Sequence, residues 1–170
     1  IKKIRDDLLK HSIVKKRFLN EATIAASLHH PSIMPVYQIY NTKTTLYYTM
    51  PHIKGSTLKN ILKDTIQREK QNKTPHPIGN SLSELVRIFL QICQATSYCH
   101  SHQILHRDLK PENVMIGNFG EVILLDWGLA CYAHDLFQDE ASTIEKVVPP
   151  TFTMPGKVLG TLSYMPPERI

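Results

Sequence analysis

Apolar residues recur along this chain with two different periods, one typical of helices and one of strands. From Ser12 to Leu28 the apolar spacing of three and four residues predicts a helix. Phe18, Glu21 and Ala25 share one face with Leu28, so Glu21 interrupts an otherwise apolar stripe. Because an unpaired carboxylate there would be costly, Glu21 either reaches solvent at the boundary of the core or meets a cation across a cleft.

Two strand-like runs follow this helix. Residues Ile33 to Tyr40 form a β-type run, the sequence NTKT predicts a hairpin-like connection, and Thr45 to Met50 predicts the second strand. Pro51 and Gly55 are expected to end that strand.

A short helix is expected next, near Leu58 to Leu62. The polar stretch from Asp64 to Asn80 is rich in Lys, Gln, Asn and Pro. It predicts a surface insertion and a boundary between two lobes.

The second half of the chain begins with a long amphipathic pattern. Ser81 and Glu84 have the spacing of a capping box, which predicts a helix through about Cys99. Its buried stripe is expected to comprise Leu85, Ile88, Phe89, Ile92 and Ala95. The run VMI, a turn at GNFG and the run EVILL then predict a β-hairpin whose second strand, Val122 to Leu125, ends at Asp126.

Composition narrows the class of protein. With 170 residues and 42% hydrophobic content, the chain can bury one core shared between two small lobes. The net charge of +5 suits anionic ligands such as nucleotide phosphates, but it is too scattered to indicate nucleic acid. No apolar run reaches the roughly 18 residues of a membrane span, so we expect none within this segment. The three cysteines and nine histidines form no zinc spacing, which favours reduced, buried cysteines in a cytoplasmic protein.

The candidate chemistry lies in the stretch HRDLKPEN, from His106 to Asn113. A charged run is usually a solvated surface, but the spacing here argues against that. Asp108 and Asn113 are five residues apart, and Asp126 lies 13 residues beyond Asn113 across the predicted hairpin. A hairpin of that length folds back and can bring Asp126 beside Asn113. Converging oxygen ligands suit Mg²⁺, and phosphoryl transfer depends mainly on such positioning and charge neutralisation.

Three ordered motifs resemble those of one family. HRDLKPEN, DWG at Asp126 to Gly128 and GTLSYMPPE at Gly160 to Glu168 resemble the catalytic loop, metal-binding triplet and substrate-side motif of bacterial Hanks-type serine/threonine protein kinases. The resemblance covers residues 1–170. It implies an α+β, bilobal protein-kinase fold truncated at both ends. Residues 1–50 would be part of a β-rich N-lobe, 51–55 the hinge, and 56–170 part of a helical C-lobe that includes the activation loop.

The resemblance also implies a reaction, the transfer of the ATP γ-phosphoryl group to Ser and Thr hydroxyls of protein substrates. Asp108 would be the base that accepts the hydroxyl proton, and Lys110 would lie beside the transferred group. Asn113 and Asp126 would hold Mg²⁺. His106 would be a packed core histidine that holds the catalytic loop to the triplet.

The same resemblance assigns residues to the nucleotide and the substrate. Lys2, in a sequence like the end of a V-A-I-K strand, would pair with Glu21. Lys3 is the competitor, but strand alternation would turn it to the opposite face. Thr161 would lie in the substrate-docking ledge. The adenine would be contacted by Met50 as gatekeeper, by backbone groups of Pro51 and Ile53, and by Met115.

For regulation, the resemblance implies that Arg107 binds a phosphorylated residue of the activation loop, which suits a bidentate guanidinium. Thr153 is the expected acceptor and Thr151 the second choice, while the alternative is that TFTMP is merely a surface loop. Autophosphorylation would bring two copies together as a homodimer.

Two departures from the family pattern affect these expectations. Trp127 replaces the usual Phe of the triplet, and the small Ala25 is expected to face it. No glycine-rich phosphate loop precedes Lys2, so we expect residues 1–170 alone to be inactive as a kinase. A membrane anchor outside the segment is compatible with these expectations, and the alternative function is a pseudokinase or ATP-binding scaffold.

Overall fold

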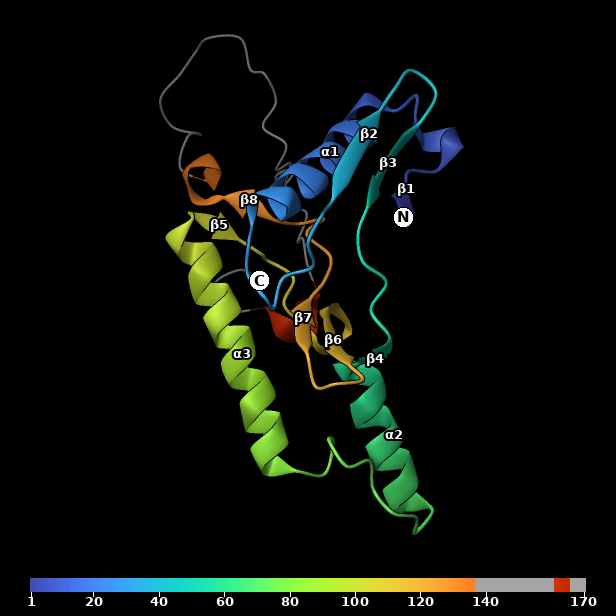
Figure 1. The fold of residues 1–170 in the computed structure, drawn as a ribbon, viewed down its shortest axis with the longest axis vertical. Coiled ribbons are helices and arrows are strands. Elements are labelled where there is room, and N and C mark those ends of the chain that lie inside the picture. Colours follow the sequence, from blue (N-terminus) through green and yellow to red (C-terminus); the bar gives the residue numbers. More distant parts are fainter. Residues whose placement is uncertain (137–160, 166–170) are drawn as a thin grey trace.

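The computed structural model describes residues 1–136 and 161–165. Its first part combines a small antiparallel sheet with one helix (Figure 1). The sheet has the strand order β1–β3–β2, from β1 (Lys2–Lys3), β2 (Gln38–Asn41) and β3 (Leu46–Thr49). Helix α1 (Ser12–Ser27) crosses beside it, after the 3-10 turn η1 (Asp6–Leu8).

Helix α1 matches the helix that the apolar spacing predicted and ends one residue earlier. The Leu28 N–H donates to the Ala25 carbonyl at 3.4 Å, and the chain then becomes extended. The helix buries Glu21 together with Ala22, Ile24 and Ala25. Glu21 is only 7% exposed, so the reading that it reaches solvent is wrong.

The predicted strand from Ile33 to Tyr40 is wrong in its first half. Pro35 has no N–H for a ladder hydrogen bond, and only Gln38–Asn41 pairs with β3. Ile33 instead forms a parallel bridge with Leu124, from the other part of the molecule. The Leu124 N–H donates to the Ser32 carbonyl at 2.8 Å, so this segment links the two parts of the fold.

The second sheet has the order β4–β6–β7 and contains the predicted hairpin. Strand β4 (Gly55–Thr57) pairs with β6 (Val114–Gly117), and β6 pairs with β7 (Val122–Leu124), all antiparallel. The chain passes from β3 through residues 50–54 into β4, between the two sheets (Figure 1).

Helix α2 (Leu58–Lys70) is longer than predicted, so the stretch from Asp64 begins as helix rather than as an irregular insertion. Ile61 and Thr65 are buried on one face. Asp64 and Arg68 form an i,i+4 pair at 2.6 Å on the solvent face. The polar residues between Asp64 and Lys70 therefore belong to the outer face of an amphipathic helix.

Helix α3 (Leu82–Ser101) begins at the predicted cap, but only half of the capping box forms. The Ser81 hydroxyl accepts from the Glu84 N–H at 3.3 Å, while the Glu84 carboxylate binds Arg87 at 2.9 Å. Ile88 and Ala95 are buried as expected, but the Phe89 side chain is 63% exposed, so its place in the buried stripe is wrong. Phe89 lies one position, about 100°, around the helix from Ile88.

A third pairing joins the segment just before HRDLKPEN to the segment just after the DWG triplet. Strand β5 (Ile104–Leu105) pairs antiparallel with β8 (Cys131–Tyr132). The shorter turns are η2 (Pro111–Asn113), η3 (Ala133–Leu136) and η5 (Leu162–Tyr164). Cys99 and Cys131 are buried as predicted, but Cys93 is exposed on α3.

None of the helices in residues 1–136 and 161–165 combines the length and apolar character needed to cross a bilayer.

Gly55 offers a test of the second sheet, because β4 approaches β6 too closely there for a side chain. A Cβ on Gly55 would lie 2.1 Å from the Ile116 carbonyl oxygen and 2.8 Å from the Gly117 Cα. We expect Gly55→Ala to lower the free energy of unfolding by about 1–3 kcal/mol, as overpacking does. Denaturant unfolding would measure this, on the complete kinase domain of the full-length protein in which this chain occurs, called the parent below. The exposed neighbour offers a control, Ser56→Ala, with an expected change of about 0.5 kcal/mol or less; equal effects would contradict the packing argument.

Candidate active site

The stretch from His106 to Asn113, called the catalytic stretch below, directly follows strand β5. The buried His106 side chain anchors it to the core. His106 is 4% exposed and packs against Trp127 in a tilted arrangement, with ring centroids 4.7 Å apart and an interplanar angle of 58°. Its Nε2 lies 3.1 Å from the Leu125 carbonyl, and its Nδ1 accepts from the Asp108 N–H at 3.3 Å. The prediction of a packed core histidine is confirmed. Burial lowers the pKa of His106, which keeps the ring neutral and suited to this donor–acceptor pair.

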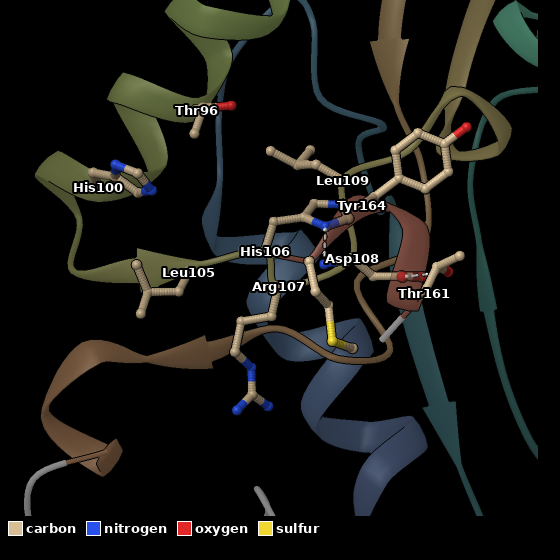
Figure 2. A pocket seen from close by; sticks show the side chains of 10 residues that line it. Thr96, His100, Leu105, His106, Arg107, Asp108, Leu109, Thr161 and Tyr164 are labelled. Atoms are coloured by element: carbon tan, nitrogen blue, oxygen red, sulfur yellow. Dashed lines mark hydrogen bonds between the residues drawn. The ribbon is translucent and has the colours of Figure 1, made fainter. Parts of the chain in front are cut away.

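Asp108 lies at the centre of a polar cluster, and Figure 2 shows its hydrogen bond with Thr161. Its Oδ2 accepts from Lys110 Nζ at 2.7 Å and from Asn113 Nδ2 at 3.1 Å. Its Oδ1 accepts from the Thr161 hydroxyl at 3.1 Å, and that hydroxyl in turn accepts from Lys110 at 2.8 Å. The structure thus brings together four predicted site residues, one of them 53 positions from Asp108 in the sequence.

These contacts decide the charge of Asp108. Burial raises its pKa, but the hydrogen bonds from Lys110, Thr161 and Asn113 outweigh burial and hold the pKa below its ordinary value. The Lys110 pKa is raised in turn by its hydrogen bond to Asp108. Near neutral pH the pair is a carboxylate and an ammonium.

The hairpin places Asn113 and Asp126 at neighbouring positions on adjacent strand ends. The Leu125 N–H donates to the Asn113 carbonyl at 2.9 Å, immediately before Asp126. Because Asn113 uses its Nδ2 to donate to Asp108, its Oδ1 remains for another partner. The Asp126 carboxylate is 52% exposed, and its Oδ1 accepts from the Gly128 N–H at 3.2 Å. An amide oxygen and an accessible carboxylate fit a hard cation such as Mg²⁺.

Lys2, not Lys3, pairs with the buried Glu21. Lys3 lies on the alternate face of β1 and pairs with Asp6 at 2.9 Å. Lys2 Nζ also lies 3.8 Å from Asp126 Oδ1, so it connects the α1 carboxylate with the end of β7. The spacing argument missed Tyr48, whose hydroxyl donates to Glu21 at 2.7 Å. The alternation of Leu46, Tyr48 and Met50 in the second strand was the available signal.

A cavity of about 420 Å³ lies between the two sheets. It brings together every residue predicted to contact the nucleotide base, together with Lys2 and Asp126. Ala25 and Trp127 both line it, and Trp127 is 3% exposed, in keeping with a small side chain facing a large one. Residues not predicted there are Met34, Val36, Tyr48, His52 and Leu125.

A second cavity, of about 540 Å³, lies on the other side of the catalytic stretch. In Figure 2 it opens between Thr96 and His100 of α3, the stretch from Leu105 to Leu109, and Tyr164 of η5. Asp108 and Thr161 line this cavity rather than the one between the sheets. A second reactant can therefore approach the Asp108 carboxylate through this cavity, from outside the cavity between the sheets.

The backbone is strained on both sides of the site. Arg107 has φ of 64° and Asp126 has φ of 60°, both in the left-handed region. Such conformations cost about 1–3 kcal/mol each and cluster at functional sites. Arg107 Nε donates to the Leu129 carbonyl at 2.6 Å, which ties the catalytic loop to the segment after DWG. The predicted acceptors Thr151 and Thr153 lie outside the described residues.

Comparison with known proteins agrees with this arrangement. The protein kinase domain model matches residues 1–170. The serine/threonine-protein kinase PknD of Protochlamydia amoebophila is 49% identical over 99% of this chain, and PknD of Chlamydia pneumoniae is 45% identical over all of it. PknD of Chlamydia caviae is 42% identical, also over the whole chain. The chain spans 18% of the length of each of these relatives.

The buried, neutral His106 makes stability depend on pH. Its pKa lies below the ordinary 6.5 when folded, so the unfolded chain binds the proton first and stability is lost as pH falls through about 6.5. We expect His106→Gln to flatten this loss between about pH 7.5 and 5.5, where one proton is worth up to about 1.4 kcal/mol per pH unit.

The measurement is denaturant unfolding of the complete kinase domain of the parent at both pH values. The exposed His29 provides a matched control, His29→Gln, which should keep the pH dependence of the unchanged protein. A His106→Gln variant with that same dependence would show that His106 titrates normally in the folded state.

Proposed function

This chain belongs to the protein kinase domain family, and on that basis we propose that it carries the ATP-binding and phosphoryl-transfer residues of a serine/threonine protein kinase. The observation that carries the proposal is the polar cluster around Asp108. A charged carboxylate held by Lys110, Asn113 and Thr161, on the wall of the cavity of about 540 Å³, is suited to receive a proton from an incoming hydroxyl.

In the proposed reaction the hydroxyl oxygen of a protein Ser or Thr attacks the γ-phosphorus of ATP. The bond from that phosphorus to the bridging oxygen breaks, ADP leaves, and the hydroxyl proton passes to Asp108. Lys110 donates one ammonium hydrogen to Asp108 and a second to Thr161, so its third hydrogen is available to the transferred group. Thr161 links the two and is assigned to the substrate side of the site.

Asn113 and Asp126 are the proposed magnesium ligands. The free amide oxygen of Asn113 and the accessible carboxylate of Asp126 are both hard oxygen donors. When bound, Mg²⁺ would neutralise the phosphate charges of ATP. Lys2 would contribute a cation for the phosphates, with Glu21 and Tyr48 fixing its ammonium group. Burial and the neighbouring Glu21 raise the pKa of Tyr48, so its hydroxyl remains a donor.

The cavity of about 420 Å³ is the proposed adenine site. Met50, Ile53 and Met115 give it apolar walls, and the backbone of residues 51–53 offers polar groups to the base. Residues 1–50 are then assigned to the N-lobe, 51–55 to the hinge and 56–170 to the C-lobe with the activation loop. We assign this domain to the cytoplasm, where ATP and protein substrates are available.

The base role of Asp108 predicts a separation of binding from catalysis. Asp108→Asn keeps the size and polarity of the side chain but cannot accept the proton. In the complete parent we expect phosphoryl transfer to fall by about 10²–10⁴-fold or more, with the Kd for Mg-ATP nearly unchanged. Radiolabel transfer to protein and nucleotide titration would measure the two quantities.

Two further variants sharpen this experiment. Asp126→Asn removes a charged metal ligand and should weaken Mg-ATP binding as well as transfer. Asp64→Asn alters a surface pair on α2 and should leave both parameters at the parental values. Turnover of Asp108→Asn near the parental rate would overturn the assigned role, and Mg-ATP binding by the unchanged parent without any transfer would instead indicate a pseudokinase.

Regulation by loop phosphorylation is proposed through Arg107, whose guanidinium can bind a phosphate in bidentate fashion. We expect active parent protein to carry phosphate on Thr153, or on Thr151 as second choice, placed there by a second copy in a homodimer. Arg107→Lys keeps the charge but not the fork, and should reduce activation of phosphorylated enzyme. Phosphopeptide mapping that finds both threonines unmodified in active enzyme would contradict this proposal.

A further inference from the structure

An ion pair beside the catalytic loop has no part in the proposed phosphoryl transfer. Lys59, in the first turn of α2, binds the Oε1 of Glu112 in η2. Helix α2 packs against η2, so the pair joins two elements already in contact. The hydrogen bond from Lys59 lowers the pKa of Glu112, so the carboxylate is charged near neutral pH.

The two partners of this pair are not equally available to a ligand. Oε2 of Glu112 is buried and has no hydrogen-bond partner among the described residues, while Oε1 is already engaged by Lys59. The Lys59 side chain is 41% exposed, and its ammonium has three hydrogens to donate. The Glu112 side chain is 30% exposed, but one carboxylate oxygen is buried and the other is bound by Lys59, so the group chiefly available to an incoming molecule is the Lys59 ammonium.

A neighbouring lysine adds further positive charge to this part of the surface. Lys63 is exposed one turn further along α2, four residues after Lys59 and therefore on the same face of the helix. The nearby acid on this helix, Asp64, is engaged by Arg68 at 2.6 Å. We call Lys59 and Lys63 the α2 rim.

The α2 rim lies close to the path of any protein substrate. Glu112 follows Asp108 by four residues on the same loop, and the acceptor hydroxyl has to reach Asp108. Residues two or three positions from the acceptor extend about 7–10 Å from it along an extended peptide. One flank of the substrate therefore passes within reach of η2 and of the first turn of α2.

We propose that the α2 rim selects acidic residues flanking the acceptor Ser or Thr, with Lys59 as the specificity-determining residue. The inference rests on the proposed kinase function and names its substrate class. Lys59 acts in two ways, because it attracts a substrate carboxylate and also keeps Glu112 from attracting a substrate cation.

The test uses the complete parent protein and three peptides with the same Ser acceptor. Their flanking positions, two and three residues to either side, carry Glu, Gln or Lys. We expect the parental kcat/KM to be about 10-fold higher for the Glu peptide than for the Lys peptide, equivalent to about 1.4 kcal/mol. Raising the salt concentration should narrow this ratio, since the charges are exposed.

Variants then assign the preference to Lys59. Lys59→Ala should bring the Glu-to-Lys ratio to about 1 or below it, because Glu112 becomes available to cations, while Lys59→Arg should keep the preference. Lys70→Ala removes a lysine from the far end of the same helix, about 16 Å along its axis, and should keep the parental ratio. A general loss of activity cancels in the ratio, so misfolding or loop disorder cannot imitate the effect.

Each result decides between the proposals. A parental preference for the Lys peptide, or a ratio that Lys59→Ala leaves unchanged, would overturn the role of Lys59 while leaving the kinase function intact. Absence of transfer to all three peptides and to protein substrates would overturn the proposed function, and this inference with it.

Discussion

The parallel bridge between Ile33 and Leu124 connects the two sheets on which the candidate site depends. Leu124 donates its N–H to Ser32 at 2.8 Å and accepts from the Met34 N–H at 3.3 Å, while β6 pairs with its other side. Both bridge residues are nearly inaccessible, with exposures of 2% and 1%. Asp126 follows two residues later, so the strand that carries it is held from both sides. Because the bridge segment directly follows α1, the same contact fixes the helix that carries Glu21.

The carboxylates of the site differ in how deeply they are buried and in how many partners they have. Glu21 is buried and satisfied by Lys2 and Tyr48, so a carboxylate inside the core is tolerated. Asp108 is held by Lys110, Asn113 and Thr161, whereas Asp126 remains half exposed. The buried Glu21 thus positions Lys2, whereas the half-exposed Asp126 is open to a ligand. The His106 ring supports this arrangement without adding charge, since burial keeps it neutral.

The pair of Lys59 and Glu112 shows how the same loop can separate chemistry from substrate selection. Asp108 and Thr161 line one cavity and Asp126 lines the other, while Glu112 is paired with Lys59 of α2. A change at the α2 rim would alter the charge that a substrate meets without altering the donors to Asp108. Specificity on this surface would then depend on a helix whose outer face tolerates substitution.

The sequence by itself determined the elements whose signals are local. The helical spacing of α1, the cap at Ser81 and the GNFG hairpin all appear as expected, because each depends on residues within a few positions. The motifs around Asp108 and Asp126 also sufficed for the kinase family and for the candidate residues. Local patterns failed where long-range packing decides: Ile33 bridges Leu124 instead of extending β2, α2 continues beyond Leu62 because Thr65 is buried, and Phe89 faces outward.

Only the tertiary structure decided which polar groups meet. The choice of Lys2 over Lys3 for Glu21 was already predicted from strand alternation, but the further partners of these charged groups were not. Tyr48 completes that pair, and Thr161 reaches Asp108 from 53 positions away. The contact between Lys59 and Glu112 likewise joins residues 53 positions apart. Sequence spacing constrains contacts only within one element, whereas contacts between elements depend on how their faces pack, and that packing is a property of the whole fold.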